Sequence, residues 1–171
     1  CSRDAARIES AREDVGAELG VVCDLSKPGG AGELVRVVEQ QFGSCDIVIV
    51  NTGGPPKALF ADVTVEQWHE GFQGLWMSAV DAIQAALPGM KRRRWGRILL
   101  VTSVAAREPM PALTVSNGLR AGLLGMAKSL SAEVAPDGIT VNCILPGYTD
   151  TERLRDLQVP YDKISLTIPV G

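Results

Sequence analysis

Two serines and one arginine in the second half of this chain have side chains suited to stabilising a negative charge. Thr102 and Ser103 follow an apolar run, and Ser116 and Arg120 stand four residues apart in a helix-favouring stretch. Hydroxyl groups donate hydrogen bonds and a guanidinium is permanently charged, so the three together could stabilise an oxyanion. An aliphatic hydroxyl is a poor proton donor, because its pKa lies far above neutrality. Tyr148 or water would then act as the acid.

The elements that position these side chains follow from the surrounding pattern. The apolar run 98–101 predicts a strand, 113–135 predicts a long helix, and 139–145 predicts a second strand that stops at Pro146 and Gly147. A loop with two prolines joins the first strand to the helix. This order of strand, loop, helix and strand indicates one unit of a parallel sheet.

The first half of the chain continues the same alternation. Helices are predicted over 4–14, 31–42 and 64–87, and apolar runs at 20–24 and 46–50 predict strands. The run at 46–50 is continuously apolar, which is typical of a strand covered on both faces. Thr64 and Gln67 form a predicted capping box, and four residues of the second helix are expected in the core: Leu34, Val37, Val38 and Phe42. We therefore expect a doubly wound parallel α/β sheet in a single domain spanning residues 1–171.

Composition argues for an ordinary globular protein and against several other classes. Of 171 residues, 46% are hydrophobic and 22% are charged, and the net charge of -3 gives no indication of nucleic-acid binding. The basic run 91–94 is interpreted as a solvated helix end. No apolar segment approaches the roughly 20 residues needed to cross a bilayer, and no signal peptide is visible, so the expected compartment is the cytoplasm. The four cysteines stand singly, which favours reduced core thiols over a metal site.

The phasing of several motifs resembles the second half of a short-chain dehydrogenase/reductase, especially the 3-oxoacyl-[acyl-carrier-protein] reductase branch. The motifs are Ser103, the stretch 116–130, Ala135-Pro-Asp-Gly-Ile-Thr-Val-Asn142 and Pro146-Gly147. The resemblance covers the chain from Asp4 to Gly171. The resemblance implies a Rossmann-like doubly wound sheet of order 3-2-1-4-5-6-7, of which this chain would carry strands 3 to 6 with a two-strand gap.

The same resemblance indicates that both ends of the chain are incomplete. The chain opens with Cys1, and the family's first strand and glycine-rich phosphate turn would lie upstream of it. Residues 166–171 resemble the sequence before the family's last helix and strand. We therefore expect a fragment of a longer protein, the alternative being a minimal variant that closes its sheet differently.

Four residues in the first third of the chain occupy cofactor positions of the family. Arg3 would hold a ribose 2′-phosphate, which favours NADP, with NAD as the alternative; it is otherwise an ordinary solvated arginine. Asp24 would lie beside the adenine ring, or it simply caps the next helix. Asn51 would tie its strand to the neighbouring strand, and Gly53 would let the backbone approach a ligand or adopt positive φ.

The nicotinamide side of the resemblance lies near the end of the chain. Pro146 and Gly147 match the loop of the family that borders the nicotinamide, where Thr151 would hold the carboxamide and phosphates. Arg120 would hold ribose hydroxyls. The loop that would select the substrate begins at about Thr151, so the substrate itself cannot be read from the sequence.

The catalytic positions of the family are largely replaced. Ser103 is present, whereas Ser116 stands where the family has its Tyr, Arg120 where it has Lys, and Leu75 where it has Asn. One hypothesis is an atypical NADP-dependent reductase of a ketone such as a 3-oxoacyl thioester. The other is a catalytically degenerate member that binds a nucleotide or a partner without turnover; a chain without the phosphate turn could also do neither. In the full-length parent the long helices would form the interface of a homo-oligomer, a dimer or tetramer.

Overall fold

The computed structural model describes residues 1–151, 155, 165–166 and 168. Its centre is a parallel sheet of three strands in the order β1 (Ile47–Val50), β2 (Gly96–Val101) and β3 (Ile139–Ile144). Ile47 lies opposite Arg97 in the first pair, and Gly96 lies opposite Ile139 in the second. The carboxyl ends of all three strands therefore meet at one edge, which confirms the expected parallel α/β arrangement.

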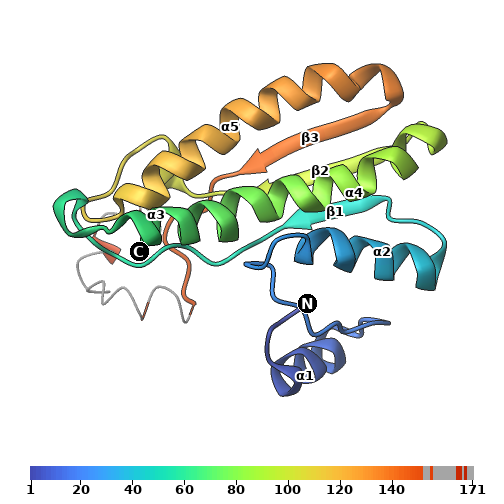
Figure 1. The fold of residues 1–171 in the computed structure, drawn as a ribbon, viewed down its shortest axis with the longest axis horizontal. Helices are drawn as coiled ribbons and strands as arrows, with labels where there is room; N and C mark the ends of the chain where they lie inside the picture. The colour runs from blue at the N-terminus through green and yellow to red at the C-terminus, as the bar shows by residue number, and fades with distance from the viewer. Residues whose placement is uncertain (152–154, 156–164, 167, 169–171) are drawn as a thin grey trace.

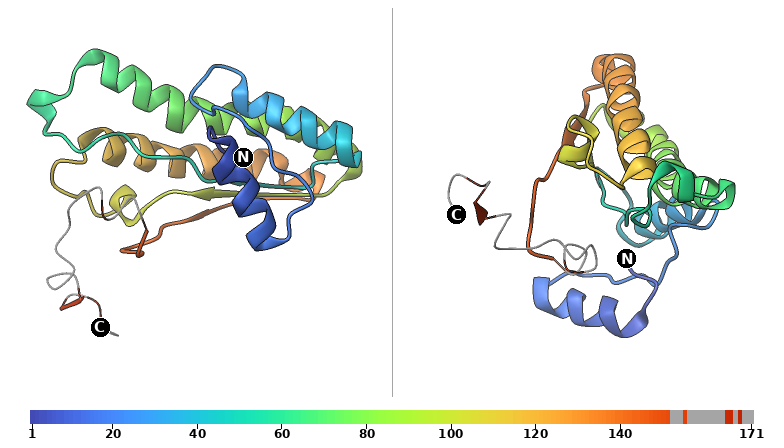
Figure 2. Two further views of the ribbon diagram at one scale, coloured as in Figure 1. Left: turned by 90° about the horizontal axis from the view of Figure 1, so that it is seen from below. Right: turned by 90° about the vertical axis from the view of Figure 1, so that its left-hand side faces the viewer.

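Helices cover one face of this sheet. Figure 1 shows α2 (Gly30–Phe42), α4 (Ser78–Arg93) and α5 (Thr114–Val134) side by side, with α1 (Ala5–Val15) set apart near the N-terminus. The two further views in Figure 2 show α1 apart from the other helices, past the β1 side of the sheet. Short helical turns complete the connections: η1 (Phe60–Asp62), η3 (Val104–Ala106) and η4 (Ala135–Asp137).

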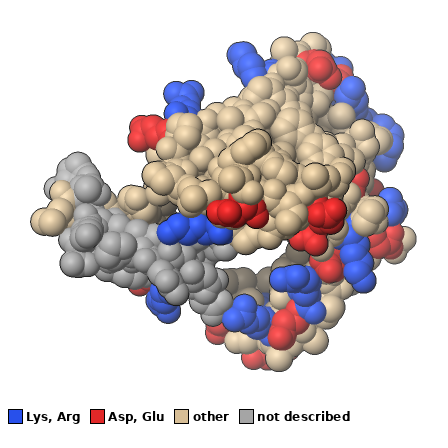
Figure 3. Space-filling view, turned by 60° about the vertical axis from the view of Figure 1, so that its left-hand side comes forward, with Lys and Arg blue, Asp and Glu red and all other residues tan. Residues whose placement is uncertain are grey.

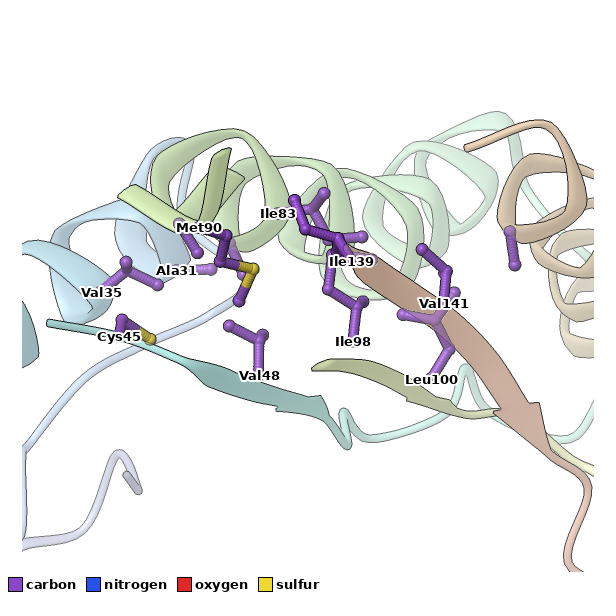
Figure 4. Close-up of a cluster of buried hydrophobic side chains, with 14 of the residues drawn as sticks. Ala31, Val35, Cys45, Val48, Ile83, Met90, Ile98, Leu100, Ile139 and Val141 are labelled. Carbon is purple, nitrogen blue, oxygen red and sulfur yellow. The ribbon is translucent and has the colours of Figure 1, made fainter. Parts of the chain in front are cut away.

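The core fills the space between the sheet and this helical layer. Figure 4 shows Val48, Ile98 and Leu100 pointing from the strands toward Ile83 and Met90 of α4. Side chains alternate along a strand, so only every second residue can face the helices. Ile47 and Ile49 point the other way and are 58% and 61% exposed. The expectation that this strand is covered on both faces is therefore wrong for the part of the chain that the structure describes.

The apolar run 20–24 does not extend the sheet. It forms one isolated parallel bridge, between Ser2 and Val22. The Ser2 N–H donates to the Val21 carbonyl (3.2 Å), and the Cys23 N–H donates to the Ser2 carbonyl (2.8 Å). In the described part of the chain, therefore, three of the four expected strands build the sheet.

The predicted helix 64–87 is longer than its sequence suggests. The Thr64 capping box is confirmed, and α3 (Val65–Gly71) continues through a π-helical segment, η2 (Phe72–Met77), into α4. The helix passes Pro88 and ends at Arg93, so the predicted end at residue 87 is wrong. Met90, beyond the proline, is fully buried, and this packing explains why the helix continues. The basic run forms its last turn, as expected.

The buried face of α2 matches the predicted one only in part: Val38 packs against the core as predicted. Ala31, Gly32 and Val35 are buried, whereas Phe42 is 50% exposed. A Cβ on Gly32 would lie 3.4 Å from the Asp81 carbonyl of α4, so this glycine lets the two helices approach closely and sets the phase. No helix in the described part of the chain is both long and apolar enough to cross a bilayer.

Candidate active site

Two hollows adjoin at the edge where the carboxyl ends of the strands meet. The first has a volume of about 810 Å³ and is bordered by Arg3, Asp24 and the segment 51–56; we call it the Arg3 hollow. The second has a volume of about 550 Å³ and is lined by Ser103, Ser116 and others; we call it the Ser116 hollow. Asn51 and Gly54 line both. The space-filling view in Figure 3 shows open space between the lower part of the molecule, which contains α1, and the body above it.

In the Ser116 hollow, the hydroxyl oxygens of both serines accept hydrogen bonds from other groups of the protein. Ser103 Oγ accepts a hydrogen bond from the Ala105 N–H (3.2 Å), and Ser116 Oγ accepts one from Arg120 Nε (3.1 Å). A hydroxyl that accepts from the protein still has its own hydrogen to donate. The arrangement therefore leaves two hydroxyl hydrogens for an oxygen of a bound ligand.

Arg120 connects helix α5 to the end of β2. It is only 9% exposed, and its Nη1 donates to the carbonyls of Thr102 (2.6 Å) and Val101 (3.3 Å). The guanidinium thus holds the strand end and Ser116 in one fixed arrangement. Its positive charge also lies next to the Ser116 hydroxyl, which strengthens that hydroxyl as a donor.

The Pro146–Gly147 loop is fixed to the same strand end. The Thr102 N–H and hydroxyl both donate to the Ile144 carbonyl at 2.9 Å, and the Val104 N–H donates to the Pro146 carbonyl at 3.0 Å. No atom lies within 4 Å of the position of a Cβ on Gly147. Thr151 lines the hollow and is exposed, with its hydroxyl donating to the Thr149 carbonyl (3.3 Å). Most of the segment after Thr151, which was expected to select the substrate, lies outside the described residues.

The contacts that hold the Met110 and Lys57 part of the Ser116 hollow were not anticipated from the sequence. The side-chain amide of Asn117 makes two hydrogen bonds to the backbone of Met110. Its Nδ2 donates to the Met110 carbonyl (2.9 Å), and its Oδ1 accepts from the Met110 N–H (3.3 Å). The Ala58 N–H donates to the carbonyl of Ala112, which has a left-handed φ of 57°. An alanine in this conformation is strained, so its surroundings must hold it there. Lys57, next to this contact, also lines the hollow.

The residues of the Arg3 hollow only partly meet their expected roles. Asp24 accepts hydrogen bonds from the hydroxyl (2.6 Å) and N–H (3.0 Å) of Ser26, which hold the pKa of Asp24 below its usual value. Asn51 is exposed and makes no side-chain hydrogen bond to any described residue, so the expected tie between strands is wrong. Gly53 does not have positive φ, but the space above it is open, as a close approach of a ligand requires.

Leu75, which the sequence resemblance matched to the Asn of the family, belongs to the core. It is 2% exposed and lies in the π-helical segment of the long helix. The amide Nε2 of Gln73, two residues earlier, is buried without a hydrogen-bond partner among the described residues, and Gln73 lines the Arg3 hollow. A polar group of this kind is rarely left unsatisfied, which indicates that a ligand or water completes it.

The chemistry of the two hollows fits an extended ligand that carries phosphate at one end. Arg3 supplies a cation in the first hollow, and the open backbone at Gly53 and Gly147 allows close contact with a ligand. The serines supply hydrogen-bond donors in the second hollow. A glycine-rich phosphate turn is absent from the described residues, so the middle of such a ligand has no dedicated site there.

Comparison with known proteins gives a consistent family. A family model described as Enoyl-(Acyl carrier protein) reductase matches residues 2–168. The chain is 32% identical over 145 residues to a D-beta-hydroxybutyrate dehydrogenase of Rhizobium meliloti, covering 85% of this chain and 56% of that protein. It is 31% identical over 139 residues to the 3-oxoacyl-[acyl-carrier-protein] reductase MabA of Mycobacterium avium, covering 81% and 54% respectively. The chain thus spans little more than half the length of these relatives.

Solved structures agree with the sequence matches. YwfH, an NADPH-dependent reductase involved in bacilysin biosynthesis, superposes with a TM-score of 0.83 at 29% identity, over 91% of this chain and 64% of that one. An L-sorbose reductase from Gluconobacter frateurii, solved with NADPH and L-sorbose, gives 0.80 at 32% identity, over 85% and 57%. With the parallel sheet and the ordered strand-end loops, these matches establish that the chain belongs to the short-chain dehydrogenase/reductase family.

Proposed function

We propose that the full-length protein is an NADP-dependent oxidoreductase that reduces a ketone, such as a 3-oxoacyl thioester. The observation that carries this proposal is the pair of hydroxyls in the Ser116 hollow. Ser103 and Ser116 line the same hollow and each accepts a hydrogen bond from the protein, so each keeps its own hydroxyl hydrogen to donate to a carbonyl oxygen. The cofactor supplies the hydride when bound.

The residues of the hollow act on the oxygen of the substrate. As the carbonyl carbon is reduced, negative charge develops on that oxygen, and Ser103 and Ser116 donate to it. Arg120 contributes through Ser116, which it holds and polarises, while its other contacts fix the end of β2. The proton comes from Tyr148, which lines the hollow and is 41% exposed, or from water.

The two hollows divide the cofactor between them. Arg3, in the Arg3 hollow, takes the 2′-phosphate and so favours NADP over NAD. Gly147 and Thr151 border the nicotinamide in the Ser116 hollow. NADPH-dependent reductases among the relatives support this choice of cofactor.

A second function is favoured by the replaced catalytic positions. Leu75 is packed in the core. Arg120, at the position matched to the family's Lys, donates hydrogen bonds to main-chain carbonyls. A protein with these features would bind the nucleotide or a partner without transferring hydride.

The proposed protein is also a homo-oligomer of the cytoplasm. Large apolar side chains are exposed on the loop and helices that precede and follow the capping box: Leu59, Phe60, Val65 and Phe72. Figure 3 shows a broad area of the upper body without charged side chains. Burial of this surface against a second copy would remove it from water.

Calorimetric titration with NADPH and NADH, followed by a carbonyl screen that monitors NADPH absorbance, tests these alternatives. We expect NADPH to bind more tightly than NADH, with the preference lost in Arg3→Ala and kept in the exposed control Arg92→Ala. Turnover that falls in Ser116→Ala but not in the exposed control Ser129→Ala supports the reductase. Binding without turnover, with turnover gained in Ser116→Tyr/Arg120→Lys, supports the degenerate member. Absence of nucleotide binding refutes the reductase and the nucleotide-binding form of the degenerate member, and leaves partner binding as the remaining function.

A further inference from the structure

We propose that the substrate of this site is an oxo acid whose carboxylate is bound by Lys57. The inference rests on the proposed reduction and specifies its substrate class. It starts from the charge of the Ser116 hollow, which has two cationic lining residues, Lys57 and Arg120, and no Asp or Glu among the described residues that line it. A hollow with this charge attracts an anion and disfavours a cation.

Lys57 is the cation available to a ligand. Arg120 is 9% exposed and directs its Nε and Nη1 to Ser116 and the end of β2, whereas Lys57 is exposed and has no carboxylate within salt-bridge distance among the described residues. Other cations of the chain do have such partners: Arg93 lies 2.7 Å from Asp46. Among the described residues, therefore, no carboxylate compensates the Lys57 charge beside the hollow.

The backbone holds Lys57 in place. The next residue, Ala58, pairs with Leu113 in an isolated parallel bridge, and its N–H donates to the Ala112 carbonyl at 2.8 Å. Asn117 fixes the other end of this wall through Met110. The ammonium group therefore starts from a backbone position that is anchored to the wall of the hollow, which reduces the entropy cost of binding an anion there.

The remaining lining residues limit the body of the substrate. Apolar side chains form the wall adjoining Lys57: Val104, Met110, Pro111 and Leu113. The hydroxyls of Ser103 and Ser116 provide donors for the carbonyl oxygen. A molecule that binds the serines, the apolar wall and Lys57 together has a ketone, a short apolar body and a terminal anion. Lysine acts as a compact point charge, so Lys57 would bind the anion through its charge and not its shape, and we assign this anion as a carboxylate.

The test uses matched pairs of 2-, 3- and 4-oxo acids and their methyl esters, which differ in charge but share the ketone. In the full-length protein with NADPH, we expect kcat/KM to favour one acid over its ester. Lys57→Met should reduce this acid-to-ester ratio about tenfold, as the loss of a charge-assisted hydrogen bond predicts. Lys57→Arg should retain the preference. The control Lys128→Met, at an exposed position on α5, should leave the ratio unchanged.

Two results would overturn the inference: equal use of acids and esters, or an unchanged acid-to-ester ratio in Lys57→Met. If no carbonyl is reduced, calorimetric titration of the same acids and esters into the NADPH-loaded protein separates the two proposals. Acid binding that depends on Lys57 supports the substrate class while refuting turnover. Failure of every acid to bind refutes the substrate class as well.

Discussion

Replacement of Arg120 by Met should destabilise the fold as well as the site. The side chain makes three described hydrogen bonds, one to Ser116 and two to the carbonyls of Val101 and Thr102. Each carbonyl left without this donor lowers the stability by about 1–3 kcal/mol. Part of this loss is offset because the variant no longer buries a charge. We expect the free energy of unfolding to fall by about 3 kcal/mol, which corresponds to a lower Tm by roughly 6–12 °C in a domain of this size.

Urea unfolding followed by tryptophan fluorescence measures this loss. Arg120→Lys should lose about half as much, because an ammonium can replace one contact but cannot span Ser116 and the strand end together. The exposed control Arg92→Met should unfold like the wild type. An Arg120→Met protein with the unfolding midpoint of the wild type would show that the guanidinium does not hold β2 and α5 together.

Three further predictions concern separate parts of the fold. Gly138→Ala should lower Tm more than Gly43→Ala. Both glycines have left-handed φ, but a Cβ at Gly138 would also overlap a main-chain oxygen. An equal decrease in Tm for the two variants in thermal unfolding would contradict this overlap. Thr64→Ala should cost about 1 kcal/mol in urea unfolding through loss of the capping box, with Thr64→Ser retaining most of it. Burial raises the pKa of the Cys45 thiol, so its reactive thiolate form should become populated only at a higher pH than that of an ordinary thiol. At pH 8, iodoacetamide should therefore label exposed Cys1 well before Cys45, which mass-spectrometric mapping can measure.

The fold was predictable where local pattern and tertiary packing agree. The strands at 98–101 and 139–145 and the helix between them were read correctly, because each apolar run matches the period of its element. Predictions failed where a distant contact decided. The helix continues past Pro88 because Met90 is needed in the core, and the phase of α2 depends on a glycine that meets the neighbouring helix.

The candidate site shows the same division. Ser103, Ser116 and Arg120 were found because the end of a strand and the start of the following helix converge in a parallel sheet. Lys57 and Asn117 were missed because their positions depend on contacts between distant segments. Ala58 meets Leu113 through a single bridge, and no periodicity in the sequence marks such a contact.

The segment shared by the two hollows has a thermodynamic consequence. Asn51 and Gly54 contribute to the walls of both, so a ligand in one hollow restricts the same backbone that a ligand in the other must order. The first ligand would then bear most of that entropy cost, and the second would bind more tightly. Linkage requires the enhancement to be equal in both directions. We therefore expect occupation of one hollow to favour occupation of the other, even if the positions of the helices and strands do not change.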